Sequence, residues 1–201
     1  MLGLPKSTEV NKTIFKKVIY EKYPREMALD RKKQFDADVS KMVVTNEISP
    51  VSINVKEGEH TKAIFVIRVE LKKKDYNERN MILISKIFGQ KLLLVLKYED
   101  EMSLGIYQTK LITSEWQQES ELLIKGLDLD QIWENVVAQI GKIEVKSGNT
   151  LDEQITINDQ KARLLKYIEK LENMAWIERQ PQKKFELAQE IRMCKNALED
   201  M

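Results

Sequence analysis

The sequence predicts an α/β (α+β) fold, in which a mixed sheet with a strand-helix-strand core and a hairpin precedes a C-terminal α-helical hairpin. Three observations predict this fold. Two strongly apolar runs, residues 63–71 and 91–96, flank a segment with helical spacing. An acidic turn at residues 99–101 then reverses the chain into an alternating run. Beyond residue 150 the apolar residues recur at intervals of four and three, which is typical of paired helices.

The two apolar runs form the predicted core. Residues 63–71 and 91–96 are apolar enough to be covered on both faces, and residues 75–88 between them carry one apolar helical face. Asp75 followed by Glu78 resembles a capping box at the start of that helix. A strand, a helix and a strand in immediate succession predict a parallel pair joined by a right-handed crossover. Residues 103–110 then form an antiparallel strand.

The N-terminal segments read as two helices and two strands. A helix is expected to begin at Ser7, and a second one to occupy residues 26–38. A short β-branched strand within residues 39–48 is stopped by Pro50. Residues 51–55 alternate between apolar and polar side chains, which predicts a half-exposed strand.

The C-terminal half divides at a polar stretch. Asp128 is a good N-cap for a helix with one apolar face that ends at Gly141. The composition then shifts toward lysine, serine and glycine. We therefore predict a mixed α/β domain at residues 1–141, a linker at 142–150 and a helical hairpin at 151–201.

The apolar stripe of the tail is the predicted partner surface. Pro181 suits the first turn of a second helix, so the chain is expected to reverse just before it. Helices of this length are marginal alone, which indicates that the stripe packs against the sheet domain or another chain. The predicted partner-binding residues are Leu164, Ile168, Leu171, Leu187, Ile191 and Leu198.

Composition excludes several classes of protein. The chain has 201 residues, 42% of them apolar, and a formal charge of +1, which argues against disorder and against a strongly basic nucleic-acid binder. One cysteine and one histidine make no usual zinc set, and no apolar run is long enough to span a bilayer. We expect no metal, no cofactor, no membrane contact and a cytoplasmic location.

Two weak signals for chemistry remain. Lysines and arginines outnumber acids near the N-terminus, which favours a solvated helix face over a nucleic-acid site, although an adaptor that binds DNA is an alternative. The residues concerned are Lys16, Lys17, Arg31, Lys32 and Lys33.

The second signal is Glu70-Leu71-Lys72 at the end of the first core strand. Glu70 and Lys72 share one face, as the glutamate and lysine of a metal-dependent nuclease do, and the order of elements resembles the restriction-endonuclease-like core. That site also needs an acid on the preceding strand, where residues 51–55 offer Asn54. The sequence therefore favours a non-catalytic protein, with the nuclease as the alternative.

Several short motifs in a fixed order resemble a bacterial family of domains of unknown function, family 4391. They are Leu4-Pro5-Lys6-Ser7-Thr8, Leu92-Leu93-Leu94-Val95-Leu96, Gly126-Leu127-Asp128-Leu129-Asp130, Ile132-Trp133-Glu134-Asn135, Leu171-Glu172, Glu178-Arg179-Gln180 and Lys184-Phe185-Glu186-Leu187. The chain departs from the family pattern at Pro181, where polar and aromatic residues are usual.

The resemblance implies a small protein that is often encoded beside helicase and DNA-methyltransferase genes in restriction or phage-defence clusters. It carries no agreed catalytic residues, so none is transferred. We therefore expect a non-catalytic accessory subunit whose protein partner is a helicase or DNA methyltransferase, with only indirect contact to nucleic acid.

Overall fold

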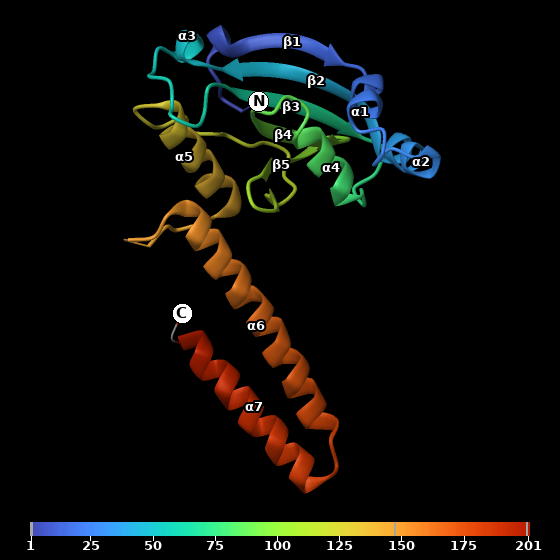
Figure 1. The fold of residues 1–201 in the computed structure, drawn as a ribbon, viewed down its shortest axis with the longest axis vertical. Coiled ribbons are helices and arrows are strands. Elements are labelled where there is room, and N and C mark those ends of the chain that lie inside the picture. Colours follow the sequence, from blue (N-terminus) through green and yellow to red (C-terminus); the bar gives the residue numbers. More distant parts are fainter. Residues whose placement is uncertain (1, 147, 200) are drawn as a thin grey trace. The chain divides into compact units, whose positions relative to one another are not determined.

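The computed structural model describes residues 2–146, 148–199 and 201, and the chain divides into two compact units, Met1–Ile143 and Glu144–Met201. The first unit is a mixed sheet with helices, and the second contains a pair of helices (Figure 1). This architecture confirms the predicted fold class.

The sheet has six strands that follow one another in chain order. They are β1 (Glu9–Ile14), β2 (Val39–Ile48), β3 (Ile64–Leu71), β4 (Lys91–Tyr98), β5 (Glu101–Tyr107) and β6 (Leu111–Thr113). Strands β3 and β4 are parallel, with Ile67 opposite Leu94, and every other neighbouring pair is antiparallel. The parallel core pair and the β4–β5 hairpin are thus confirmed, whereas the short β6 was not predicted.

Helices cover both faces of this sheet. The first unit contains the 3₁₀ turn η1 (Lys6–Thr8), α1 (Lys16–Lys22), α2 (Leu29–Asp38), α3 (Pro50–Ile53), α4 (Glu78–Ser85) and α5 (Leu129–Gly141). Buried side chains of α1, α2 and α4 pack with alternate residues of β3 and β4, such as Ile67 and Leu94, in one hydrophobic cluster. The residues between them point to the opposite face, where the indole of Trp133 on α5 bonds to Gln108 beside β5.

The prediction of a helix beginning near Ser7 is wrong. Only the turn η1 forms there, and the chain continues as β1, which pairs with β2 through Thr13 and Val43. Most of β1 is exposed, and Asn11 has a positive φ of 54° where the register shifts. An edge strand with so little buried surface shows no apolar alternation in its sequence, which explains the error.

The predicted strand at residues 51–55 is also wrong, because α3 occupies this place. Ser49 and Ser52 form a capping box, and Pro50 stands at the first helical position. Asn54 then ends the turn in the left-handed conformation. Local capping chemistry therefore overrides the apolar alternation of five residues.

Two other predicted helices have different ends. The helix expected at residues 75–88 is shorter, since Asn77 rather than Asp75 caps α4 by accepting from the backbone N–H of Arg79. The predicted cap of α5 is confirmed, because Asp128 accepts from the N–H of Gln131 at 2.9 Å. Gly141 stays within α5, and Lys142 takes the left-handed conformation that ends it.

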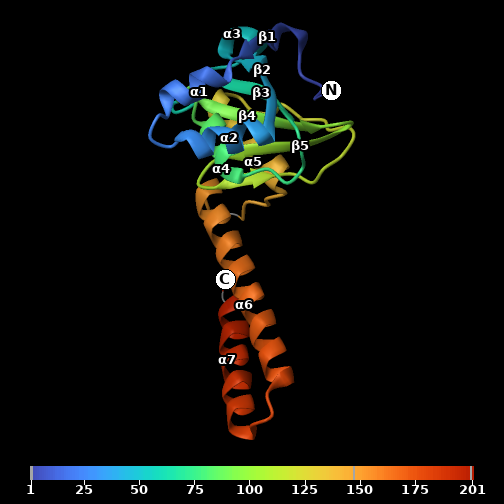
Figure 2. The ribbon, with the colours of Figure 1, turned by 90° about the vertical axis from the view of Figure 1, so that its right-hand side faces the viewer.

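The second unit contains α6 (Leu151–Ile177) and α7 (Pro181–Glu199), which pack side by side (Figure 2). A capping box of Thr150 and Glu153 starts α6. The Tyr167 hydroxyl donates to Glu190 at 2.6 Å and joins the two helices. The predicted helical pair is confirmed, and no helix of the described residues is long and apolar enough to cross a membrane.

Candidate functional site

Glu70 of the predicted nuclease motif lies among cations. It stands next to the end of β3, and its Oε1 is 3.6 Å from the Nε of Arg68 on the same face. Across the sheet, Glu70 is in register with Lys41 on β2 and Lys97 on β4. Lys72 follows β3 as an exposed residue. These neighbours make Glu70 an ion-paired residue of a basic strip.

The residue beside the Glu70-Leu71-Lys72 motif differs from the one that the sequence predicted. The strand before β3 is β2, so Asn54 is not the counterpart of the missing acid. Asp38 directly precedes β2, and its carbonyl oxygen accepts from the N–H of Lys72 at 2.8 Å. Asp38 was not among the predicted site residues, although its place before the β-branched strand β2 is a signal that could have found it.

The carboxylate of Asp38 is buried, with 2% of the residue exposed, and it is fully engaged. It accepts from the Asn77 N–H at 2.9 Å and the Asn80 side chain at 2.8 Å, and Lys73 lies 3.1 Å away. These bonds tie the start of β2 to the first turn of α4 and to the end of β3. Asp38 therefore acts as a structural anchor in this arrangement.

Asp38 and Glu70 point to different faces of the sheet. Val69 and Leu71, the neighbours of Glu70 on β3, belong to the cluster that packs against α4. Strand alternation sends Glu70 to the other face, whereas the Asp38 carboxylate bonds residues of α4. The two carboxylates do not converge. Within the described part of the chain, no group of three potential metal ligands comes together.

The basic residues near the N-terminus are largely engaged within the fold. Lys16 lies 2.8 Å from Asp36, and Lys17 lies 3.4 Å from Glu21. Burial would raise the pKa of Asp36, but hydrogen bonds from Lys16 and Tyr20 hold it below its ordinary value. The pKa of Tyr20 is raised by burial and by its bond to Asp36.

The remaining members of this basic group are spread over α2. Arg31 donates to Gln34, the ammonium of Lys32 lies 5.4 Å from the Tyr20 ring centroid, and Lys33 is exposed. The five predicted residues thus belong to a partly neutralised helix surface.

The predicted partner-binding stripe lines the seam between α6 and α7. Ile168 and Leu171 are buried, and the other four residues are half-buried, while α7 packs along α6. The half-buried members are Leu164, Leu187, Ile191 and Leu198. The structure thus brings all six together within the hairpin, where Ile168 and Leu171 have little surface left for another chain.

A different set of apolar residues is exposed at the end of the hairpin where the chain reverses. We call residues 174–185 the hairpin tip. Trp176 is 88% exposed, Ile177 is 75% exposed and Phe185 is 63% exposed. All three residues are apolar in the sequence. Heptad spacing alone does not show which apolar residues face the other helix and which face the solvent. The tip is therefore a candidate protein-binding surface that the spacing did not single out.

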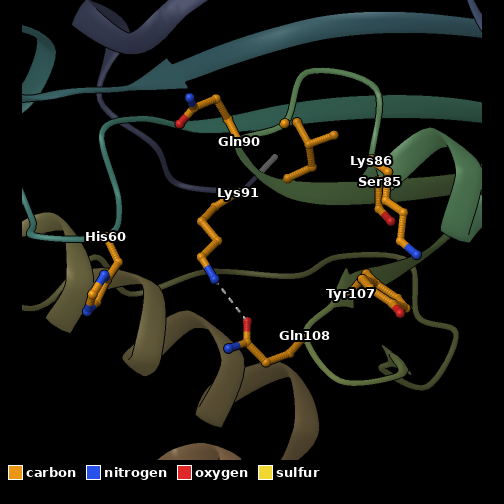
Figure 3. Close-up of a pocket in the computed structure, with 9 residues that line it drawn as sticks. His60, Ser85, Lys86, Gln90, Lys91, Tyr107 and Gln108 are labelled. Carbon is orange, nitrogen blue, oxygen red and sulfur yellow. Dashed lines mark hydrogen bonds between the residues drawn. The ribbon is translucent and has the colours of Figure 1, made fainter. Parts of the chain in front are cut away.

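A cavity of about 330 Å³ lies at the end of the sheet where β4 begins and β5 ends (Figure 3). Its lining combines cationic and neutral polar side chains with the chain reversal after α4. The lining residues are His60, Ser85, Lys86, Gly89, Gln90, Lys91, Leu92, Tyr107 and Gln108. The size falls within the range of small-molecule sites. This cavity is the second candidate site of the protein.

One wall of the cavity is held by a carboxylate of α5. Asp130 accepts from the N–H of His60 at 3.1 Å. Burial would raise the pKa of Asp130, but hydrogen bonds from Thr61, His60 and Glu59 lower it below 3.8. A Cβ at Gly58 would lie 2.6 Å from the Asp130 carboxyl carbon, so only glycine allows this close approach.

Comparison with known protein families shows to which family the chain belongs. The sequence profile of the Domain of unknown function (DUF4391) matches residues 2–198. The chain belongs to this family. The match covers nearly the whole chain, so both units are parts of the DUF4391 domain. No curated protein and no solved structure matches the chain.

Proposed function

We propose that this DUF4391 protein is a non-catalytic accessory subunit, whose hairpin tip docks onto a protein partner. The observation that carries the proposal is the exposure of Trp176, which is 88% accessible at the end of α6. Tryptophan is among the residues most enriched at the centres of protein interfaces. Ile177 and Phe185 enlarge the apolar surface on either side of the chain reversal.

The chemistry of the tip indicates what kind of partner surface fits it. Exposed contiguous apolar groups on a folded protein mark interaction surfaces, because their contact with water is unfavourable. Arg179, Lys183 and Lys184 lie between Ile177 and Phe185 in the sequence, and Glu178 is the single acid of the tip. The complementary partner surface is an apolar groove with an acidic rim.

The partner is proposed to be a helicase or a DNA methyltransferase of a bacterial restriction or phage-defence system. The chain belongs to DUF4391, and the resemblance of its motifs to this family implies a protein encoded beside helicase and DNA-methyltransferase genes. Contact with nucleic acid would then be indirect, through the partner, and the protein would act in the cytoplasm where its partner meets DNA.

The test is co-purification of the full chain with a helicase or DNA methyltransferase of a restriction or phage-defence system from the same organism. The variant Trp176→Ser/Phe185→Ser is expected to lower association at least tenfold, the loss of a typical pair of interface anchors. The matched control is Leu165→Ser/Met193→Ser, which removes exposed apolar groups from the same helices away from the tip. Full association of the tip variant, or equal loss in the control, would refute the proposal.

Substitutions in the seam would answer a different question. Ile168→Asp/Leu171→Asp places two charges in the buried contact between α6 and α7. We expect this variant to separate the helices, so a lost complex would report on hairpin folding. Circular dichroism of the variant distinguishes this effect from a direct loss of contact.

The alternative function is a metal-dependent nuclease that uses Glu70 and Lys72. The observation in its favour is that the antiparallel strands β1, β2 and β3 are followed by α4 and the parallel strand β4, with the motif at the end of β3, as in the restriction-endonuclease-like core. Incubation of the purified chain with DNA and Mg²⁺ or Mn²⁺ tests it. Cleavage that is lost in Glu70→Gln would favour the nuclease over the accessory subunit.

A further inference from the structure

We propose that the cavity between Lys86 and Lys91 binds the phosphate group of a nucleotide-sized ligand. The proposal concerns the sheet unit and does not depend on the hairpin tip.

The charge of the lining has one sign. Lys86 and Lys91 contribute two ammonium groups, and no carboxylate lines the cavity within the described residues. In a chain with a formal charge of +1, this segregation produces a local positive potential. An anion is therefore the ligand that complements the cavity.

Lys91 is held in place by a neutral amide and an aromatic ring. Its Nζ donates to the Oε1 of Gln108 at 3.3 Å and lies 5.3 Å from the ring centroid of Trp133. The same Oε1 accepts from the Trp133 indole at 2.8 Å. The side chains of Lys91, Gln108 and Trp133 therefore fix one another's positions. An ammonium has three donors, and no described carboxylate lies within ion-pair distance of Lys91. Lys91 can therefore donate further bonds to a bound anion.

Lys86 is supported by the chain reversal after α4. Its carbonyl oxygen accepts from the Tyr23 hydroxyl at 2.8 Å, and the carbonyl of Ile87 accepts from the Lys22 ammonium. These donors satisfy the partial negative charge at the end of α4, which would otherwise repel an anion. The Lys86 ammonium lies 4.3 Å from the ring centroid of Tyr107. Among the described residues it forms no ion pair with a carboxylate.

The arrangement suits phosphate better than a simple carboxylate. Figure 3 shows Lys86 above Tyr107 on one side of the cavity and Lys91 reaching toward Gln108 in its middle. A phosphate group offers three or more acceptor oxygens to donors on different sides, whereas a carboxylate offers two. The volume of about 330 Å³ leaves space beyond the phosphate for the rest of a small ligand.

The experiment uses the full chain labelled with ¹⁵N and follows the Trp133 indole N–H resonance. This resonance reports on the cavity, because the indole bonds to the same Gln108 oxygen as Lys91. AMP is expected to shift it saturably, with affinity falling as salt is raised. Lys86→Gln/Lys91→Gln should weaken AMP binding at least tenfold. Lys125→Gln/Lys166→Gln, which removes two exposed lysines elsewhere, should leave it unchanged.

Titrations with other ligands show which kind of phosphate compound the cavity binds. Tighter binding of a short 5′-phosphorylated oligonucleotide than of AMP, lost in the same lysine variant, would support the site and assign it to nucleic-acid ends. Equal shifts by acetate and AMP would overturn the preference for phosphate. No shift with AMP, inorganic phosphate or the oligonucleotide would overturn the site itself. None of these outcomes changes the co-purification test of the hairpin tip.

Discussion

The sheet unit and the helical hairpin bury their apolar side chains to different depths. In the sheet unit, residues such as Phe35, Ile67 and Leu94 have no measurable exposure, because α1, α2 and α4 pack against the face of the sheet that carries Ile67 and Leu94. In the hairpin, α6 contributes the buried residues Ile168 and Leu171, and no residue of α7 is fully buried. A sheet with two covered faces completes its own core. A pair of helices has one seam and leaves its outer faces in water.

This difference explains where stability and binding are expected to reside. Burial of apolar surface is the dominant favourable contribution to the free energy of folding. The sheet unit is therefore expected to provide most of the stability of the protein. The hairpin keeps large apolar residues exposed. It is expected to be stabilised when the surface of a partner covers them.

The largest effect is expected from Leu94→Ala in the middle of β4. Removing a fully buried leucine leaves a cavity and costs about 3 kcal/mol of unfolding free energy. Leu187→Ala on α7 removes a half-buried side chain of the same size, and we expect a cost below about 1 kcal/mol. Urea denaturation of both variants measures the two values. Equal costs would remove the contrast between the units.

Asp38→Ala is expected to destabilise the sheet unit by about 2 kcal/mol, because the buried donors of Asn77 and Asn80 lose their acceptor. Asp75→Ala, which changes an exposed carboxylate two residues before Asn77, should change stability by less than about 0.5 kcal/mol. Thermal unfolding compares the two variants. A silent Asp38 variant would show that this carboxylate is not an anchor.

Thr150→Ala tests the start of the hairpin. It removes the hydroxyl that accepts from the Glu153 N–H, and it breaks the capping box at a cost of about 1 kcal/mol to α6. Thr156→Ala, in the interior of the same helix, keeps the cap and serves as the control. Helical circular dichroism should fall in the first variant only, and an unchanged spectrum would contradict the role of the cap.

The smallest effect is expected from Asp130, whose pKa is lowered by the bonds of residues 59–61. A lowered pKa in the folded state means that this carboxylate stabilises the fold above its ordinary pKa of 3.8. The contribution is lost as the pH falls through the folded value. Asp130→Asn should therefore lower stability slightly at neutral pH and have no effect at strongly acidic pH. A difference that is the same at every pH would contradict this linkage.

The parts of the fold that the sequence predicted rest on strong local signals. The two apolar runs beside a helix gave the parallel β3–β4 pair, and Asp128 marked the start of α5. The failures occurred where another interaction decided the structure. Ser49 and Pro50 turned an alternating run into α3, and β1 forms a strand at the edge although most of its side chains are exposed.

The candidate sites were harder to predict than the fold. His60, the two lysines Lys86 and Lys91, and Gln108 reach one cavity from three separate segments, so no single spacing in the sequence connects them. Asp38 is the last residue of α2, and the pairing of β2 with β3 brings it beside Lys72. Heptad spacing found the hairpin, but it does not tell the seam residue Ile168 from the exposed Trp176.

Hydrogen exchange of the free full-length chain tests the contrast between the units most directly. Amides of β3 and β4 are expected to exchange only through global unfolding of the sheet unit. Amides of α7 are expected to exchange through a separate opening with a much lower free energy, since one seam holds this helix. Protection of α7 equal to that of β4 would contradict the account, because the hairpin would then need no further surface.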